Sequence, residues 1–277
     1  MSAARLASRD RVQAPFGRRA VPVTGRDRLG PYVVLGCEDL AGPRPQAGQF
    51  YMLAASARWG GGAAERPFLP RAFSVLRAPL GSDRLEFLLH DVGPGTNRLC
   101  ELDEGDGLQI LGPLGVGFRS PRGDRRPLLA GGGVGIAPLA ILQDEFAAAR
   151  GVEEPVPALL GFRDADHARG AALLAAAAVA TDDGGAGHHG PVTDLLLDEL
   201  HREPRTEVYA CGPPAMLEAV RMICAERGVP VQLALESGMA CGFGACFGCV
   251  VETHEGFIRL CVDGPVLDGD RLPAVIA

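Results

Sequence analysis

The segment "RRPLLAGGGVGIAPLAILQDEFAAA" (residues 125–149) decides the fold class of this 277-residue chain. It begins with an apolar run at 127–130, passes through glycines, and then carries Leu139, Leu142 and Phe146 at helical spacing. A strand that turns through glycines into a helix is a typical unit of a parallel α/β sheet. Three more strand candidates follow it with helical or loop-rich stretches between them: "VPALLGF" (156–162), "EVYAC" (207–211) and "VQLALE" (231–236). This alternation predicts a doubly wound parallel sheet.

The chain before this segment has a different pattern, in which short apolar runs are separated by Gly, Pro and Asp. The runs are "PYVVLGCEDL" (31–40), "GQFYMLAA" (48–55), "RAFSVLRA" (71–78), "RLEFLLHDV" (84–92) and "GLQILGPL" (107–114). Short strands at this spacing, with turn signals between them, predict an antiparallel β barrel. After Glu236 the chain becomes rich in glycine and cysteine, which indicates a small appended unit.

These changes in composition divide the chain into four parts. We expect a flexible extension at 1–19, a β barrel at 20–122, an α/β domain at 123–228, and a C-terminal strand with a cysteine-rich domain at 229–277.

The overall composition excludes several classes of protein. The net charge of −7 comes from scattered carboxylates, which gives no sign of a nucleic-acid partner. No apolar run approaches the roughly 18 to 20 residues of a membrane span. The first twenty residues are basic but lack the apolar centre of a secretory signal, so we expect a cytoplasmic protein, with an organelle-targeting segment as the alternative. In a reducing compartment the eight cysteines are more readily explained by metal binding than by disulfides.

Four of the cysteines follow the pattern C-x4-C-x2-C-x11-C, namely Cys241, Cys246, Cys249 and Cys261. This spacing is typical of plant-type ferredoxins, which hold a 2Fe-2S cluster. Glycines between the cysteines let the loop wrap tightly and direct backbone N–H groups at sulfur. The alternative is a structural zinc site, but such sites usually show two C-x2-C pairs and only one is present here.

Three other cysteines, Cys37, Cys100 and Cys224, sit in apolar runs and are expected to be small buried side chains.

The glycine-rich turn contains Gly133, Gly135 and Pro138 in the pattern G-x-G-x-x-P. Its amide groups would cradle a phosphate at the start of the following helix, and a proline is tolerated in the first helical turn. The alternative is a plain tight turn. The segment "YACGPPAML" (209–217) is likewise a strand that runs through a glycine turn into a predicted helix. It would place Cys211 and Gly212 at the carboxyl edge of the sheet, where such folds bind ligands.

Two motifs in the barrel half suggest a second phosphate site. Arg71 precedes Phe73 and Ser74 on one strand, so a guanidinium that can pair a pyrophosphate shares a face with an aromatic ring. Gly95 and Thr96 lie in the small-residue turn "GPGTNRL" (93–99) before a predicted helix. Each motif alone is also explained by an ordinary surface arginine or helix cap.

Taken in order, these motifs and the segment "GPLGVGF" (112–118) resemble the ferredoxin–NADP reductase superfamily over roughly residues 20–270. With the cysteine loop at the C-terminus, the chain is most similar to the electron-transfer subunits of the NAD-dependent, two-subunit dihydroorotate dehydrogenases. The resemblance implies a flavin-binding barrel, a nucleotide-binding α/β domain and a small 2Fe-2S domain.

The resemblance also implies roles for the motif residues. Arg71 would hold the FAD pyrophosphate, Phe73 and Ser74 would contact the flavin, and Gly95 with Thr96 would bind phosphate. The turns at Gly133 and at Cys211 and Gly212 would face NAD. This chain departs from the family at Ala72, where proline is frequent, and at Phe73, where many relatives have tyrosine; loss of the phenol removes a hydrogen bond and keeps the ring contact.

The segment "ATDDGGAGHHGPVTD" (180–194) also resembles the family near its nucleotide. Asp182 and Asp183 would repel a 2′-phosphate and favour NAD over NADP, or else they are turn residues. His188 and His189 are expected in solvent.

The resemblance implies a function that no single motif specifies. Dihydroorotate would be oxidised on a separate FMN-carrying catalytic subunit, in an assembly expected to be a heterotetramer. Its electrons would pass through the 2Fe-2S cluster and FAD to NAD⁺, in pyrimidine biosynthesis. A flavin is required between the other two groups because a cluster passes single electrons and nicotinamide accepts hydride. Positioning and redox tuning would then carry the function, with no residue needed as a general acid or base.

Two alternatives stay open at this point. One keeps the fold and makes the chain an NAD(P)H diaphorase subunit of a hydrogenase, a sulfur reductase or a transhydrogenase. The other is a non-catalytic redox or zinc sensor that uses the same scaffold, although a sensor would not need flavin and nucleotide motifs.

Overall fold

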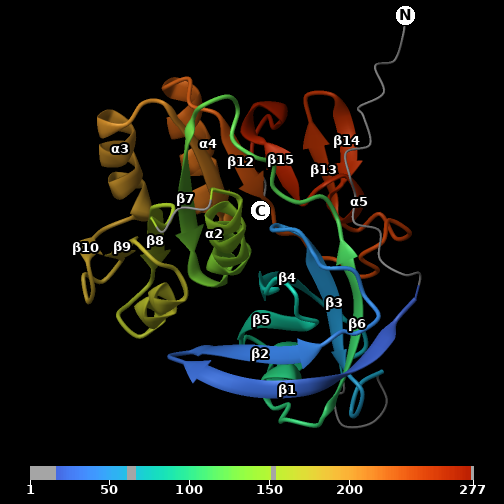
Figure 1. The fold of residues 1–277 in the computed structure, drawn as a ribbon. Helices are drawn as coiled ribbons and strands as arrows, with labels where there is room; N and C mark the ends of the chain where they lie inside the picture. Colours follow the sequence, from blue (N-terminus) through green and yellow to red (C-terminus); the bar gives the residue numbers. More distant parts are fainter. Residues whose placement is uncertain (1–16, 61–66, 151–153, 276–277) are drawn as a thin grey trace, which may run out of the picture.

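The computed structural model describes residues 17–60, 67–150 and 154–275. Three units follow one another along the chain: a closed antiparallel barrel, a mainly parallel sheet, and a small unit built around a two-stranded hairpin (Figure 1). The predicted fold class is therefore confirmed. Within the described ranges, no helix is long and apolar enough to cross a membrane.

The barrel closes in the strand order β1-β2-β5-β4-β3-β6. Its elements are β1 (Arg19–Leu29), β2 (Tyr32–Glu38), β3 (Phe50–Ala55), β4 (Arg71–Arg77), β5 (Arg84–His90), the short helix α1 (Pro94–Cys100) and β6 (Gly107–Leu114). The five apolar runs predicted as strands all form barrel strands. β1 was not predicted, because Val21 and Val23 are its only buried apolar residues and they form no apolar run.

The second sheet has the order β10-β9-β8-β7-β11-β12-β15, and all its strands are parallel except the last. The strands are β7 (Arg126–Gly132), β8 (Ala158–Phe162), β9 (Ala177–Thr181), β10 (His188–His189), β11 (Thr206–Cys211), β12 (Val231–Ala234) and β15 (Val266–Asp268). The helical elements are η1 (Gly133–Ile136), α2 (Ala137–Arg150), η2 (His167–Leu173), α3 (Val192–Arg202), α4 (Pro214–Glu226) and η3 (Gly269–Arg271). The strand, glycine turn and helix predicted at 125–149 are β7, η1 and α2.

Helix α2 joins the sheet to the barrel. It packs against β7 and β11 on one side and against β4 on the other, whereas α3 and α4 pack together on the sheet. Arg77 of β4 donates from Nη1 to the Ala140 carbonyl oxygen and to Asp144 Oδ2, both at 2.7 Å. Glu145 Oε1 accepts a hydrogen bond from the Ala47 backbone N–H at 3.1 Å. These contacts fix the barrel and the sheet relative to each other.

In the chain, the small C-terminal unit is inserted between β12 and β15, two strands that neighbour each other in the large sheet. The chain leaves β12, forms the cysteine loop, the hairpin β13 (Val250–Thr253) and β14 (Gly256–Arg259) and the short helix α5 (Leu260–Asp263), and returns as β15. β15 then pairs antiparallel with β12. The cysteine loop also reaches the barrel: a Cβ atom on Gly242 would lie only 2.5 Å from Met52 Cγ of β3. The unit therefore touches both larger parts of the molecule (Figure 1).

Candidate functional site

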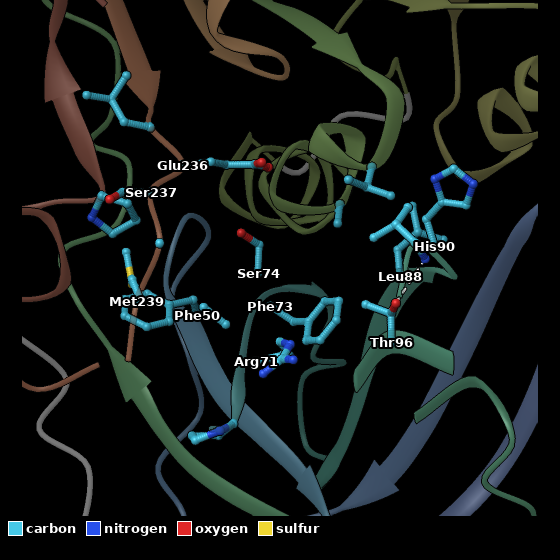
Figure 2. A pocket seen from close by; sticks show the side chains of 18 of the residues that line it. Phe50, Arg71, Phe73, Ser74, Leu88, His90, Thr96, Glu236, Ser237 and Met239 are labelled. Atoms are coloured by element: carbon cyan, nitrogen blue, oxygen red, sulfur yellow. Dashed lines mark hydrogen bonds between the residues drawn. The ribbon is translucent and has the colours of Figure 1, made fainter. Parts of the chain in front are cut away.

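A cavity of about 540 Å³ lies where the barrel, the glycine-rich turn before α2 and the cysteine unit meet. Strand β4, the turn before α1, the start of α2 and the segment 235–240 all contribute to its wall. Figure 2 shows the labelled side chains converging on it from these separate elements. Four residues predicted from sequence, Arg71, Phe73, Ser74 and Thr96, line this one cavity.

Arg71 and Gly95 form the closest contact in this wall. A Cβ atom on Gly95 would lie 2.6 Å from Arg71 Nε and 2.7 Å from its Cζ, so the guanidinium occupies the space that any side chain at 95 would need. Arg71 Nη1 donates to the Leu69 carbonyl oxygen at 2.6 Å, and its Cζ lies 5.9 Å from the centre of the Trp59 ring. The guanidinium is thereby held at the turn before α1, with further donors to offer to an anion.

The Thr96 hydroxyl is hydrogen-bonded within its own turn. It donates to the Gly93 carbonyl oxygen and accepts from the Val92 backbone N–H, both at 2.9 Å. A hydroxyl has one proton to donate, and here it closes the turn. The Thr96 side chain therefore shapes the turn, and Arg71 places a positive charge beside it.

Phe73 and Ser74 lie next to each other on β4, opposite Tyr51 and Phe50 of β3. Both line the cavity, where Ser74 offers a hydroxyl and Phe73 an aromatic ring (Figure 2). A cavity with apolar walls, a ring and one guanidinium suits a large planar ring system that carries a phosphate tail.

A second cavity, of about 550 Å³, lies at the carboxyl edge of the parallel sheet. Its wall includes the glycine turn at 132–134, Pro213 and the end of β8. Gly133 has φ of +54°, a conformation that favours glycine. His90 and Val134 line both cavities, so the two spaces adjoin.

Not every predicted residue faces a cavity. A Cβ atom on Gly135 would lie 2.6 Å from the Cys211 carbonyl oxygen, so the two turns pack directly on each other. Gly212 approaches Gly132 in the same way, with its Cβ position 3.0 Å from the Gly132 nitrogen. Pro138 is buried in the first turn of α2. These residues shape the turns that line the second cavity.

The two aspartates after β9 have different surroundings. Asp182 lines the second cavity, whereas Asp183 Oδ1 accepts a hydrogen bond from the Gly185 backbone N–H at 2.8 Å and is a turn residue. His188 and His189 are exposed, as predicted. Arg163 at the end of β8 also lines this cavity, and Asp164 pairs with it.

The four clustered cysteines interact with one another. A side-chain hydrogen bond links Cys241 with Cys246 and another links Cys249 with Cys261, and the charge of Cys241 also acts on Cys261. Within the described ranges, no three Cys, His, Asp or Glu side chains converge as ligands of a single metal ion. The spacing of these four thiols is the one by which plant-type ferredoxins hold a 2Fe-2S cluster, and it has only one of the two C-x2-C pairs usual in a zinc site.

Backbone N–H groups in the loop face the sulfur atoms. Gly248 N–H donates to Cys246 Sγ and Cys261 N–H to Cys249 Sγ, each at 3.5 Å. Burial would raise the pKa of Cys241, but backbone N–H groups that include those of Cys246 and Phe243 outweigh it and lower the pKa to about 6. Donors that favour thiolate are what an iron–sulfur loop requires.

The three isolated cysteines behave as predicted. Cys37, Cys100 and Cys224 are buried free thiols, and burial raises the pKa of each: to about 12 for Cys37 and Cys224 and to about 11 for Cys100.

Two titratable residues in the cavity walls were missed by the sequence analysis. Glu236 follows β12 and directs its carboxylate into the first cavity (Figure 2), and burial raises its pKa. His90 ends β5, and burial together with the charges of His167 and Arg163 lowers its pKa. An acidic residue directly after a parallel strand was the available signal for Glu236, because ligands bind at that edge.

The comparisons with known proteins agree with this geometry. The family model described as the iron-sulfur cluster binding domain of dihydroorotate dehydrogenase B matches residues 236–273. The protein named dihydroorotate dehydrogenase B (NAD(+)), electron transfer subunit, from Caldanaerobacter subterraneus subsp. tengcongensis is 36% identical over 230 residues, covering 81% of this chain and 86% of that protein. The protein of the same name from Listeria monocytogenes is 35% identical, covering 87% of this chain and 91% of its own length.

Solved structures support the fold. An NADH-dependent reduced ferredoxin–NADP oxidoreductase aligns with a TM-score of 0.75 at 24% identity, over 94% of this chain and 92% of that one. A ferredoxin NADP+ reductase from Neisseria gonorrhoeae, solved with bound FAD and NADP, aligns with a TM-score of 0.61 at 19% identity, over 76% of this chain and 92% of that one.

Proposed function

The chain belongs to the family of electron transfer subunits of dihydroorotate dehydrogenase B (NAD(+)), and on that premise we propose that it passes electrons from dihydroorotate, oxidised on a separate catalytic subunit, to NAD⁺. It is an oxidoreductase subunit that uses FAD, an iron–sulfur cluster and NAD. The names of its relatives support this role over that of a diaphorase subunit for a hydrogenase, a sulfur reductase or a transhydrogenase, and over the sensor role.

One observation supports the proposal most directly. Residues 237–240 form part of the wall of the first cavity, and Cys241 is the next residue in the chain. Gly242 then packs against Met52 of the barrel. A flavin in the cavity and a cluster in the loop would therefore be neighbours, as electron transfer between them requires.

We propose the following binding residues. Arg71, positioned over Gly95 and the turn closed by Thr96, would hold the FAD pyrophosphate, and Phe73 with Ser74 would contact the flavin ring. When bound, FAD supplies exchange between single electrons and hydride, and the cluster supplies single-electron transfer.

The remaining groups belong to the nucleotide and the cluster. The Gly133 turn, supported from behind by Gly135, Pro138, Cys211 and Gly212, would hold NAD in the second cavity. Cys241, Cys246, Cys249 and Cys261 would bind the 2Fe-2S cluster. We propose that the division at 20–122, 123–228 and 229–277 reflects these three binding tasks.

We also propose that the catalytic partner carries FMN and that the assembly is a heterotetramer in the cytoplasm. All eight cysteines are free thiols, which suits a reducing compartment. Light scattering of the two subunits mixed in equal amounts would give the mass of two copies of each, whereas a single copy of each would contradict the heterotetramer.

The test of the function is anaerobic NAD⁺ reduction by dihydroorotate. We expect NADH to form only when this protein and the dihydroorotate dehydrogenase subunit of the same organism are mixed. If the mixture forms no NADH while this protein retains flavin and cluster absorbance that bleaches with NADH, the assigned partner is wrong and the protein is a diaphorase for another system.

A further inference from the structure

His90, the last residue of β5, lies between the first and second cavities with both ring nitrogens free. It lines both cavities, and Figure 2 shows its imidazole at the border of the first. Among the residues that the structure describes, no group forms a hydrogen bond or an ion pair with this half-buried ring. An imidazole donates from one nitrogen when neutral and from both when protonated, so His90 keeps its full hydrogen-bonding capacity for a ligand.

Two rings from different parts of the molecule hold the His90 imidazole in place. The ring centres of Tyr32, from β2, and of His167, from η2, each lie 5.4 Å from that of His90, in edge-to-face contacts. The nitrogens of His167 are already engaged, because Nδ1 lies 2.7 Å from Asp164 Oδ1 and Nε2 lies 3.0 Å from Arg163 Nη2. Of the two histidines at this boundary, His90 is therefore the one available to a ligand.

The second cavity offers little positive charge to the diphosphate of a dinucleotide. Among the described residues, Arg163 is the only arginine in its wall, and it forms an ion pair with Asp164. Asp182 in the same wall carries a negative charge. Strand β5 packs against η1, the turn at Gly133 where we propose that NAD binds. A diphosphate held by this turn would lie beside the end of β5, where His90 stands.

We propose that His90 binds the diphosphate of NAD from the barrel side as an imidazolium ion. It takes up one proton from solvent when the nucleotide enters and returns that proton when the nucleotide leaves. The proposal rests on the proposed function for the placement of NAD in the second cavity. It gives the barrel a direct part in nucleotide binding, so both halves of the molecule would hold the dinucleotide.

The electrostatics of the empty site favour the neutral form of His90. Burial lowers its pKa, and the charges of His167 and Arg163 lower it further, whereas Asp91 raises it. A bound diphosphate would bring negative charge beside the ring and raise the pKa. The affinity for the nucleotide should therefore increase as the pH falls through the pKa of His90 in the occupied site.

Other ionisable groups surround this ring and could also respond to a bound anion. Those on its own strand end, on the packed elements and in the walls of the two cavities are Tyr32, Arg71, Asp91, Arg163, Asp164, His167, Asp182 and Glu236. The test therefore needs variants of His90 itself, because proton uptake by the whole protein would not identify the group.

ADP-ribose is the probe, because it carries the diphosphate of NAD and lacks the nicotinamide, so it binds without electron transfer. Its phosphates are diesters that do not titrate near neutral pH, so a proton taken up on binding goes to the protein. Isothermal titration calorimetry on the full-length protein, purified with its flavin and cluster, gives the dissociation constant. Repeating it in Tris and in Pipes, which differ in ionisation heat, gives the number of protons taken up.

Three variants separate the charge of His90 from its shape. His90→Gln keeps a hydrogen-bonding side chain and removes the titration, whereas His90→Arg carries a permanent positive charge. His201→Gln is the control, because His201 is exposed in the last turn of α3 and lines neither cavity.

We expect the wild type to take up a proton and to bind ADP-ribose about tenfold more tightly at pH 6 than at pH 8, as a shift of one pKa unit on binding gives. His90→Gln should take up no proton and bind about tenfold more weakly at pH 6. His90→Arg should bind tightly at both pH values without proton uptake, and His201→Gln should match the wild type.

Proton uptake that persists in His90→Gln would overturn the proposal, and so would binding by the wild type without proton uptake. The second outcome needs no variant, so it is decisive even if a variant fails to fold. Failure of the wild type to bind ADP-ribose would overturn both this proposal and the NAD site on which it rests. Proton uptake through His90 without dihydroorotate activity in the mixture would remove only the assigned partner.

Discussion

The Arg71 guanidinium fills the place of a side chain at Gly95, with Nε 2.6 Å from the position of the missing Cβ. The two residues come from different elements, β4 and α1. Their contact places a positive charge beside the first turn of α1. Glycine at 95 is required by this close approach, because Arg71 could not remain there beside a methyl group.

Gly95→Ala should weaken FAD binding without unfolding the protein. The added methyl group displaces the end of a flexible arginine, and alanine is favoured over glycine in a helix. Loss of a charge-assisted contact worth about 1.5–3 kcal/mol should raise the FAD dissociation constant roughly 10- to 100-fold. Titration of flavin-depleted protein with FAD measures it. Gly93→Ala is the control, because no atom lies within 4 Å of its Cβ position, and it should bind FAD like the wild type.

Gly242→Ala should detach the cysteine loop from the barrel. Gly242 has φ of +79° and its Cβ position lies 2.5 Å from Met52 Cγ, so the variant bears both backbone strain and a clash. We expect a loss of roughly 1–2 kcal/mol from the backbone and about 1–3 kcal/mol from the clash, together with lower iron and sulfide content. Gly256→Ala, with φ of +114° and open space around it, bears the strain alone. Equal iron content in both variants would contradict the role of the Met52 contact.

Cys246→Ser should abolish the visible absorbance of the cluster. Cys246 is the exposed member of the four, so replacing it disturbs packing least and tests ligation most directly. Iron and acid-labile sulfide should fall to near zero, and NADH-dependent bleaching of the flavin should persist. Cys224→Ala, at a buried cysteine outside the loop, should keep full iron; a normal iron content in Cys246→Ser would refute the ligand assignment.

Glu236→Gln should make the flavin-depleted protein more stable than the wild type at neutral pH, and equally stable at acidic pH. Because burial raises the pKa of Glu236, the carboxyl ionises in the unfolded chain before it ionises in the folded one. Below about pH 4.5 the group is neutral in both states, so the variant and the wild type should melt alike. As the pH rises through the raised pKa the wild type loses stability and the variant does not. Thermal melts at pH 4, 6 and 8 measure this; a constant difference in Tm would show that charge is not the cause.

Asp182→Asn should relax the preference for NADH over NADPH. Asp182 lines the second cavity, where we propose that NAD binds, and removing its charge would remove repulsion of a 2′-phosphate. We expect the ratio of kcat/KM for the two nucleotides to move roughly tenfold towards NADPH, which corresponds to about 1.4 kcal/mol. Asp183→Asn is the control, because Asp183 caps its own turn, and a shift of the same size there would assign selectivity to the segment as a whole.

The sequence was most informative where a residue type has few other uses. Cysteines at ferredoxin spacing predicted an iron–sulfur domain at the C-terminus, where the family model matches residues 236–273, and the glycine turn at 131–135 predicted the start of the α/β half. Both signals are local, because a few consecutive residues determine the geometry of a loop or a strand-to-helix turn.

Other features depend on contacts between distant elements and left little trace in the sequence. β1 has too few buried apolar residues to read as a strand, and β15 is only three residues long. Thr96 matched a phosphate motif, but its hydroxyl closes its own turn. Glu236 looked like the last residue of a strand, and its place in the wall of the first cavity follows only from the packing of the C-terminal unit against the sheet.

The antiparallel return of β15 beside β12 also sets how electrons can travel. Carrier domains that shuttle between a donor and an acceptor swing on a single tether, and their rate is limited by diffusion of the domain. Here the cysteine unit is attached to the same sheet at both its entry and its exit, through β12 and β15, and so is not held by a single tether. If the cluster and the flavin bind where we propose, the fold would set the spacing between them, and solvent viscosity should leave the rate of electron transfer unchanged.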